Sequence, residues 1–150
     1  MAEQRDRPHA GSNFVVEFGS GASRVGRTGF AEVVFAPFTI AEPVPGRRTP
    51  ASARPPPAPT SDPTAQRLLL RRGVTGALDL YAWWDQARRG KAPRRTMSIK
   101  LLAEDHASVV WTWRFRNVKP VSLSYSPLRG LDGGVLMETI ELAYDDVEMA

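Results

Sequence analysis

The chain has 150 residues, enough for one domain with a substantial core, and its formal net charge is +4. It contains no cysteine, which excludes disulfides, cysteine-bound zinc and thiol nucleophiles. Its two histidines, His9 and His106, are too few for a histidine-rich metal site, so we expect no metal, no cofactor and no enzymatic activity. No segment is typical of a secretion signal or of the apolar run of about 20 residues that spans a bilayer. We therefore expect a protein that is made in the cytoplasm and binds no membrane.

The first part of the chain predicts a leader, two strands and a long loop. Residues 1–12 are polar and are expected to form a flexible leader before a single domain over 13–150. Apolar residues alternate over Asn13–Phe18 and again over Gly29–Phe35, which predicts two strands that pair as a hairpin. The stretch from about 36 to 66 is rich in proline, which has no N–H to donate to a ladder or a helix. We expect an exposed spacer there, or a loop that becomes ordered against a neighbouring subunit.

The middle of the chain predicts one short strand and one helix. Arg67–Arg72 contains three successive leucines and is expected to be a strand. Ala77–Arg89 repeats apolar residues at spacings of three and four, which predicts a helix with an apolar stripe. Thr75 is the candidate N-cap of this helix, and Gly90 lies just past its end. The residues of the stripe are Leu80, Trp83, Trp84 and Ala87.

The rest of the chain predicts four more strands, at Arg94–Leu102, Ser108–Val118, Val121–Tyr125 and Val135–Tyr144. Lys119-Pro120 is expected to separate the second of these from the third. After the last strand the chain is expected to end in an acidic tail. About seven strands with one helix predict a mainly β fold, a small antiparallel β-barrel or sandwich with one packed α-helix.

The aromatic strand Ser108–Val118 has two interpretations. On one face it carries Trp111, Trp113 and Phe115, with Val109, whereas Val110, Thr112, Arg114 and Arg116 alternate on the other. The aromatic rings are expected to form the core together with Trp83 and Trp84. As an alternative, they stack on bases, which would make the chain a basic β-barrel nucleic-acid-binding module.

Charged side chains gather in two clusters. The basic cluster follows the predicted helix and consists of Arg88, Arg89, Lys91, Arg94 and Arg95; the acidic end consists of Asp145, Asp146 and Glu148. Each cluster is either solvated surface or a docking site, and we expect contacts between the basic cluster of one copy and the acidic end of another. Phosphate binding is a third option for the basic cluster, without a nucleotide-binding motif to support it. Glu138 and Glu141 fall on opposite faces of one strand, so they are not expected to form a catalytic pair.

Six segments, in order, resemble the tail tube proteins of contractile phages and of phage-derived injection systems. These segments are Asn13–Glu17, Gly29–Val33, Leu70–Gly73 with Leu80 and Trp83-Trp84, Arg94–Glu104, Trp113–Val121 and Glu138–Tyr144. Each motif is weak alone, and the ordered set is specific. The proline-rich stretch departs from the family pattern, which is less rich in proline there.

The resemblance implies a fold related to the tube protein of type VI secretion and a structural role without catalysis. It implies homohexameric rings that stack into a hollow tube inside a contractile sheath. The partners it implies are other copies of the chain, the sheath protein, baseplate or hub proteins and tube terminator proteins. A cargo protein or phage DNA would occupy the lumen. An alternative within the family is the tube-initiating ring of the baseplate.

Overall fold

The computed structural model describes residues 2, 5–19, 29–40, 66–91 and 93–150. Most of the predicted proline-rich loop, residues 41–65, lies outside these ranges, and so does part of the predicted leader. For these residues, the flexible leader and the spacer or ordering loop stay predictions. Within the described residues, no helix is long and apolar enough to cross a bilayer.

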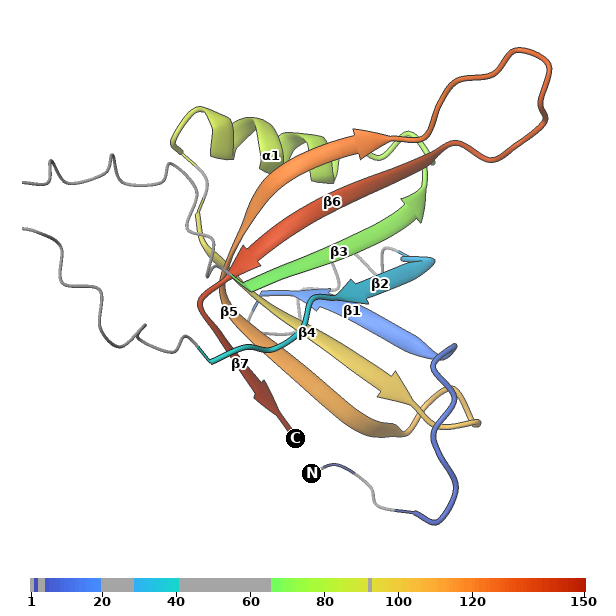
Figure 1. Cartoon of the computed structure of the whole chain (residues 1–150), viewed down its shortest axis with the longest axis vertical. Helices are drawn as coiled ribbons and strands as arrows, with labels where there is room; N and C mark the ends of the chain where they lie inside the picture. Colours follow the sequence, from blue (N-terminus) through green and yellow to red (C-terminus); the bar gives the residue numbers. More distant parts are fainter. Residues whose placement is uncertain (1, 3–4, 20–28, 41–65, 92) are drawn as a thin grey trace, which may run out of the picture.

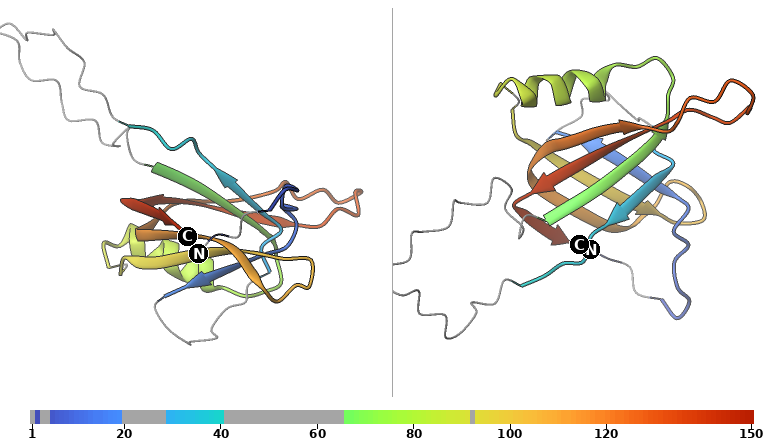
Figure 2. Two further views of the ribbon diagram at one scale, coloured as in Figure 1. Left: turned by 90° about the horizontal axis from the view of Figure 1, so that it is seen from below. Right: turned by 45° about the horizontal axis from the view of Figure 1, so that its top comes forward.

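The described residues form seven strands and one helix. In chain order these are β1 (Phe14–Phe18), β2 (Glu32–Phe35), β3 (Gln66–Gly73), α1 (Asp79–Arg88), β4 (Arg95–Leu102), β5 (Val109–Tyr125), β6 (Met137–Tyr144) and β7 (Asp146–Met149). The sheet is antiparallel and runs β1-β4-β5-β6-β3-β2, with β7 paired to β5. It curls into a half-barrel, and α1 lies beside the last part of β5 at the top of the view (Figures 1 and 2). The predicted mainly β fold with one packed helix is confirmed.

The predicted hairpin between the first two strands is wrong. β1 pairs with β4, where Val16 lies opposite Ile99, and β2 pairs with β3, where Val33 lies opposite Leu70. The two strands are joined by residues 19–31, a connection too long to fix a pairing by itself, so each strand pairs where its apolar face meets another. As a result, β1 and β2 lie at the two edges of the sheet.

β5 is one long bent strand, whereas two strands separated at Lys119-Pro120 were predicted. Its first part pairs with β4 and its last part with β6. The register shifts on both sides of the change of partner, between Phe115 and Val118 and between Pro120 and Ser122, and Asn117 has a φ of 53°. Bulges therefore bend the strand where it passes from one half of the sheet to the other. Pro120 is tolerated because β5 pairs there only with β6, opposite Leu142, and needs no donor on its other side.

The predicted division of the β5 side chains between a buried and an exposed face is correct for only part of the strand. Phe115 is fully buried and Arg114 and Arg116 are exposed, as predicted, but Val110 is buried and Val109 is exposed. The reason is a register shift: Leu102 pairs with Val109 and Leu101 with Trp111, which leaves Val110 as an extra residue. A bulge of this kind changes the side-chain phase, which a strict period of two cannot anticipate.

The chain does not end in a free acidic tail. After a turn at Asp145, whose N–H donates to the carbonyl of Arg116 at 3.1 Å, residues 146–149 form β7 beside β5. In this pairing Arg116 lies opposite Asp146 and Trp113 opposite Met149. β6 and β7 therefore follow the bend of β5 along both of its parts.

The core lies inside the curl and beneath α1. Leu80 and Trp83 are the buried residues of the helix, and the Trp83 ring lies 5.4 Å from that of Phe18. Phe115 packs on Tyr144 at 4.7 Å between ring centres. Each such side chain stabilises the fold by about 1.5–3 kcal/mol when fully buried. The predicted aromatic core is thus confirmed for Trp83 and Phe115, while Trp84 is only half-buried.

The end of α1 follows the prediction and its beginning does not. Gly90 has a φ of 71°, and the N–H groups of Gly90 and Lys91 donate to the carbonyls of Ala87 and Gln86 at 3.0 and 2.9 Å. These two bonds form a Schellman motif, which glycine favours. The helix begins two residues later than predicted, after Leu78, and no side chain caps it, so Thr75 is not the N-cap. Its first turn is fixed instead by Asp79, through a contact described below.

Candidate assembly surfaces

Three charged side chains from three elements meet under the first turn of α1. The Arg72 Nε donates to Glu138 Oε1 at 2.5 Å, and its Nη1 donates to Asp79 Oδ2 at 3.2 Å. Only 4% of Arg72 and 4% of Glu138 is exposed. Burial by itself would lower the pKa of Arg72, but its bonds to Asp79 and Glu138 raise it. Burial likewise opposes the charged form of Asp79, and the bond from Arg72 nevertheless lowers its pKa.

The strand register places this cluster. Arg72 and Glu138 are direct partners in the β3–β6 ladder, on the same face as Leu70 and Ile140. The Arg72 guanidinium also lies 5.6 Å from the centre of the Phe30 ring. This cluster was not predicted, although the sequence contains a signal for it. In each of the two strands, one position on the face that is otherwise apolar and buried carries a charged residue. The cluster ties α1 to the sheet, and the Arg72 guanidinium is shared by the two carboxylates.

Glu138 and Glu141 lie on opposite faces of β6, as predicted. Glu141 accepts a bond from the Ser122 hydroxyl at 3.0 Å and lies 3.9 Å from the Arg67 Nε, away from the buried cluster. The structure therefore separates the two carboxylates. Among the described residues, no group of three or more acidic or histidine side chains could hold a metal ion.

The predicted basic cluster is divided by the structure. Arg88 and Arg89 both bond Asp85, at 2.6 and 3.1 Å, so they share one carboxylate on the helix. The Arg95 guanidinium lies 4.8 Å from the Trp83 ring, at the edge of the core. Lys91 follows the helix end and is exposed. Near the helix end, the Arg88 guanidinium also covers the ring of Trp84 at 5.2 Å.

The acidic end already has partners within the same chain. Asp145 accepts bonds from Arg94 at 3.3 Å and from Asn117 at 3.1 Å. Glu148 accepts a bond from Arg116 at 2.8 Å, across the β5–β7 pair. The basic cluster and the acidic end therefore meet inside one molecule at Arg94 and Asp145. A contact between these clusters in different copies stays a prediction, and it would use the charges that remain exposed.

A third surface is apolar and was not predicted from the sequence. Residues 126–136 form an arm that extends beyond the sheet from the ends of β5 and β6 (Figures 1 and 2). Three of its side chains are strongly exposed, at 84% for Leu128, 102% for Leu131 and 74% for Val135. The arm is anchored at its base, where the N–H of Ser126 donates to the Met137 carbonyl and the Met137 N–H donates to the Ser126 hydroxyl, both at 2.9 Å.

Further exposed apolar side chains lie at the same end of the molecule. The Val74 N–H donates to the Leu136 carbonyl at 2.9 Å, which joins the end of β3 to the arm. The end of β5 and the start of α1 lie beside it (Figure 1). We call this surface the apolar end; its exposed members are Val74, Leu78, Tyr81, Tyr125, Leu128, Leu131 and Val135.

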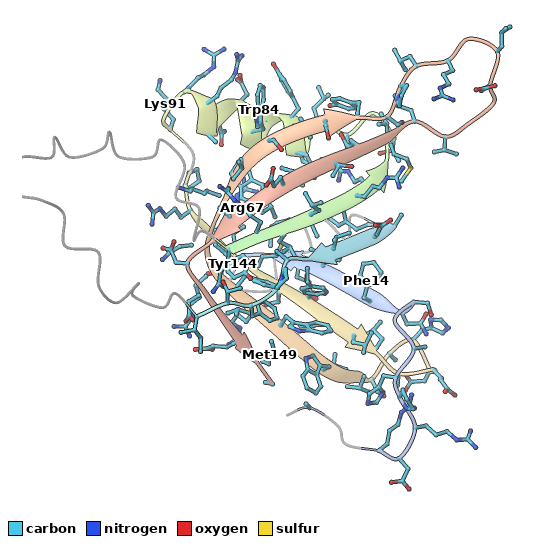
Figure 3. All side chains as sticks on the ribbon, viewed as in Figure 1. Phe14, Arg67, Trp84, Lys91, Tyr144 and Met149 are labelled. Atoms are coloured by element: carbon cyan, nitrogen blue, oxygen red, sulfur yellow. The ribbon has the colours of Figure 1, made fainter. Side chains whose placement is uncertain are left out.

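The aromatic residues of β5 do not form an open platform. Phe115 is buried, and the Trp113 ring packs on Phe35 at 5.0 Å between centres. Trp111 is half-buried, with its ring 6.1 Å from that of Trp113. The distribution of all described side chains over the ribbon is seen in Figure 3. Rings packed in this way favour the core interpretation over base stacking, which needs accessible ring faces.

Comparison with protein families gives one match. The family model of the T4-like virus tail tube protein gp19 matches residues 12–148. No curated protein is similar enough in sequence to count as a match.

Solved structures with a similar fold include chains of contractile injection systems and the protein Hcp1. A chain in the cryo-EM structure of the extracellular contractile injection system PVC, sheath/tube terminator in the extended state, has a TM-score of 0.71 and 18% identity, covering 97% of this chain and 98% of that chain. A chain of the anti-feeding prophage baseplate, 6-fold symmetrised, has a TM-score of 0.63 and 21% identity, covering 97% of both chains. Hcp1 from Flavobacterium johnsoniae has a TM-score of 0.54 and 14% identity, covering 91% of this chain and 94% of that chain. At these identities the similarity concerns the fold.

Proposed function

We infer the function of this chain from one premise: it belongs to the T4-like virus tail tube protein gp19 family. The family model covers residues 12–148 and therefore both halves of the sheet, α1 and the apolar end. The chain is a structural subunit of a tail tube. This match is the observation that carries the conclusion, and the fold shared with chains of contractile systems agrees with it.

We propose that six copies form a ring and that rings stack around a hollow lumen. A contact that closes sideways gives a ring, and one that repeats along the axis gives a filament. The edges of the sheet, β1 and β2, support sideways closure, because an edge strand presents N–H and C=O groups to a further strand. The similar baseplate chain comes from a six-fold symmetrised structure, which supports six copies in the ring.

We propose that the tube belongs to a contractile phage tail or to a phage-derived injection system. Similar chains occur in a sheath-tube complex, a tube terminating cap and a baseplate, so the partners we propose are sheath, terminator and baseplate proteins. A cargo protein or phage DNA in the lumen is part of the same proposal. The subunit is made in the cytoplasm and then becomes part of the particle.

The proposed role is passive and does not include catalysis. The buried Arg72 bonds both the buried Glu138 and the half-exposed Asp79, and so holds α1 on the sheet. A tube transmits force from a contracting sheath, and such a subunit needs rigidity more than reactive groups. The ion cluster supports this role because it secures the helix on the sheet.

Negative-stain electron microscopy of the purified chain, concentrated and dilute, tests the proposal. Six-fold rings or stacked tubes would support it. Rings that never stack would favour the second candidate, a tube-initiating ring of the baseplate, which the similarity to the anti-feeding prophage baseplate also suggests. Monomers at all concentrations that bind single-stranded nucleic acid with a steep salt dependence would contradict it and favour a nucleic-acid-binding module.

A further inference from the structure

The apolar end has the composition of a surface that is covered in an assembly. Leu131 and Leu128 are almost fully exposed at the tip of the arm, although leucine is among the residues most often buried. Single exposed apolar residues are common on proteins, but here seven come from four neighbouring segments at one end of the molecule. Several exposed apolar side chains gathered at one end of a molecule indicate an interaction site.

The charged side chains in the arm and at the start of α1 form ion pairs within the chain. Arg129 and Asp132 pair with each other in the arm at 3.5 Å, and Asp79 at the start of α1 bonds Arg72. These charged side chains thus already have partners within the chain, and the exposed apolar side chains are the groups left for a partner molecule. Interfaces between identical subunits are the ones in which apolar residues prevail and charged residues are depleted.

The apolar end is also held in place from within the molecule. The paired bonds between Ser126 and Met137 fix the base of the arm, and the Val74 N–H joins it to β3. The bond between Arg72 and Asp79 fixes the start of the helix that carries Leu78 and Tyr81. A surface that is already ordered loses less conformational entropy on binding.

We propose that the apolar end is the axial docking surface, which seats the arm of one subunit on a second copy of this chain in the next ring. This proposal rests on the proposed tube function. The contact is head to tail: if the apolar end of one copy met the apolar end of another, association would stop at two rings. A tube needs the same contact to repeat in one direction.

The test compares Leu131→Glu with Leu131→Met. The glutamate places a charge in the docked tip, whereas methionine keeps an apolar side chain of similar size. Both variants should fold like the unaltered chain, because the Leu131 side chain contacts solvent in the single subunit; thermal melting of each checks this. We expect association between rings to weaken about ten- to a hundredfold for the glutamate variant and to stay unchanged for methionine.

Sedimentation velocity and electron microscopy of the unaltered chain and both variants distinguish the outcomes. Rings without tubes in the glutamate variant support the proposal. Tubes as abundant as those of the unaltered chain overturn it and leave the tube function intact. If the unaltered chain forms neither rings nor tubes, the tube function fails, and this inference fails with it.

A crosslink provides a second measurement that does not depend on tube yield. Because the chain has no cysteine, Leu131→Cys creates one unique thiol for a photoactivatable benzophenone label. We expect illumination of assembled protein to join the arm to a second copy, at peptides outside residues 126–136. Adducts confined to the same chain, or arm-to-arm adducts only, would contradict head-to-tail docking.

Discussion

Replacing Arg72 by methionine tests the role of the buried ion cluster. The change removes the guanidinium and leaves the Glu138 carboxylate, whose side chain is 5% exposed, without its partner. Asp79, with a side chain 49% exposed, can turn to water, so the cost falls on Glu138. Breaking a buried pair from one side costs about 3–5 kcal/mol.

The assay is thermal unfolding followed by tryptophan fluorescence, since Trp83 lies in the core beneath α1. For a chain of this size we expect the melting temperature to fall by roughly 6–20 °C. The double variant Arg72→Met, Glu138→Met should recover most of the loss, because two apolar side chains of similar size leave no buried charge.

The control is the exposed pair of Arg116 and Glu148, whose side chains are 52% and 49% exposed. Substituting Arg116 by methionine should cost about 0–1 kcal/mol. The reasoning would be refuted if Arg72→Met were as mild as this control, or if the double variant were no more stable than the single one.

Three further predictions concern the helix end, the β4–β5 turn and the charged clusters. Gly90→Ala should destabilise the fold by about 1–2 kcal/mol, because the φ of 71° opposes a Cβ although no atom lies within 4 Å of it; an unchanged urea midpoint would refute this. The pKa of Asp105 is lowered to about 2 by hydrogen bonds from the Ser108 hydroxyl and backbone, so its stabilising effect is present above the ordinary value of 3.8 and is lost as the pH falls towards 2. In a plot of the free energy of unfolding against pH, Asp105→Asn should remove the fall that this carboxylate causes between pH 3.8 and about 2. An unchanged plot would contradict the assignment. Lys91→Glu and Asp146→Lys should each weaken ring formation in electron micrographs and together restore it; failure of the double variant to rescue assembly would count against a contact between the clusters.

The sequence predicted features that depend on near neighbours in the chain. Alternation with a period of two located the segments that became β1, β2, β4 and β6, because successive side chains of a strand point to opposite faces. Spacings of three and four predicted α1, and Gly90 marked its end, since a helix terminus is settled by the backbone conformation of a few residues. The six motifs indicated the family for the same reason, because each motif is made of residues that lie close together in the chain.

The sequence by itself therefore determined the place and kind of most elements, part of the aromatic core and the family. Tertiary structure decided which strands pair, how β5 bends through its bulges, and that β7 joins the sheet. It alone brought Arg72 to Glu138, 66 positions apart, and gathered the apolar end from four segments. The physical reason is that pairing and burial depend on which apolar faces meet in space, and residues distant in the chain compete for the same face.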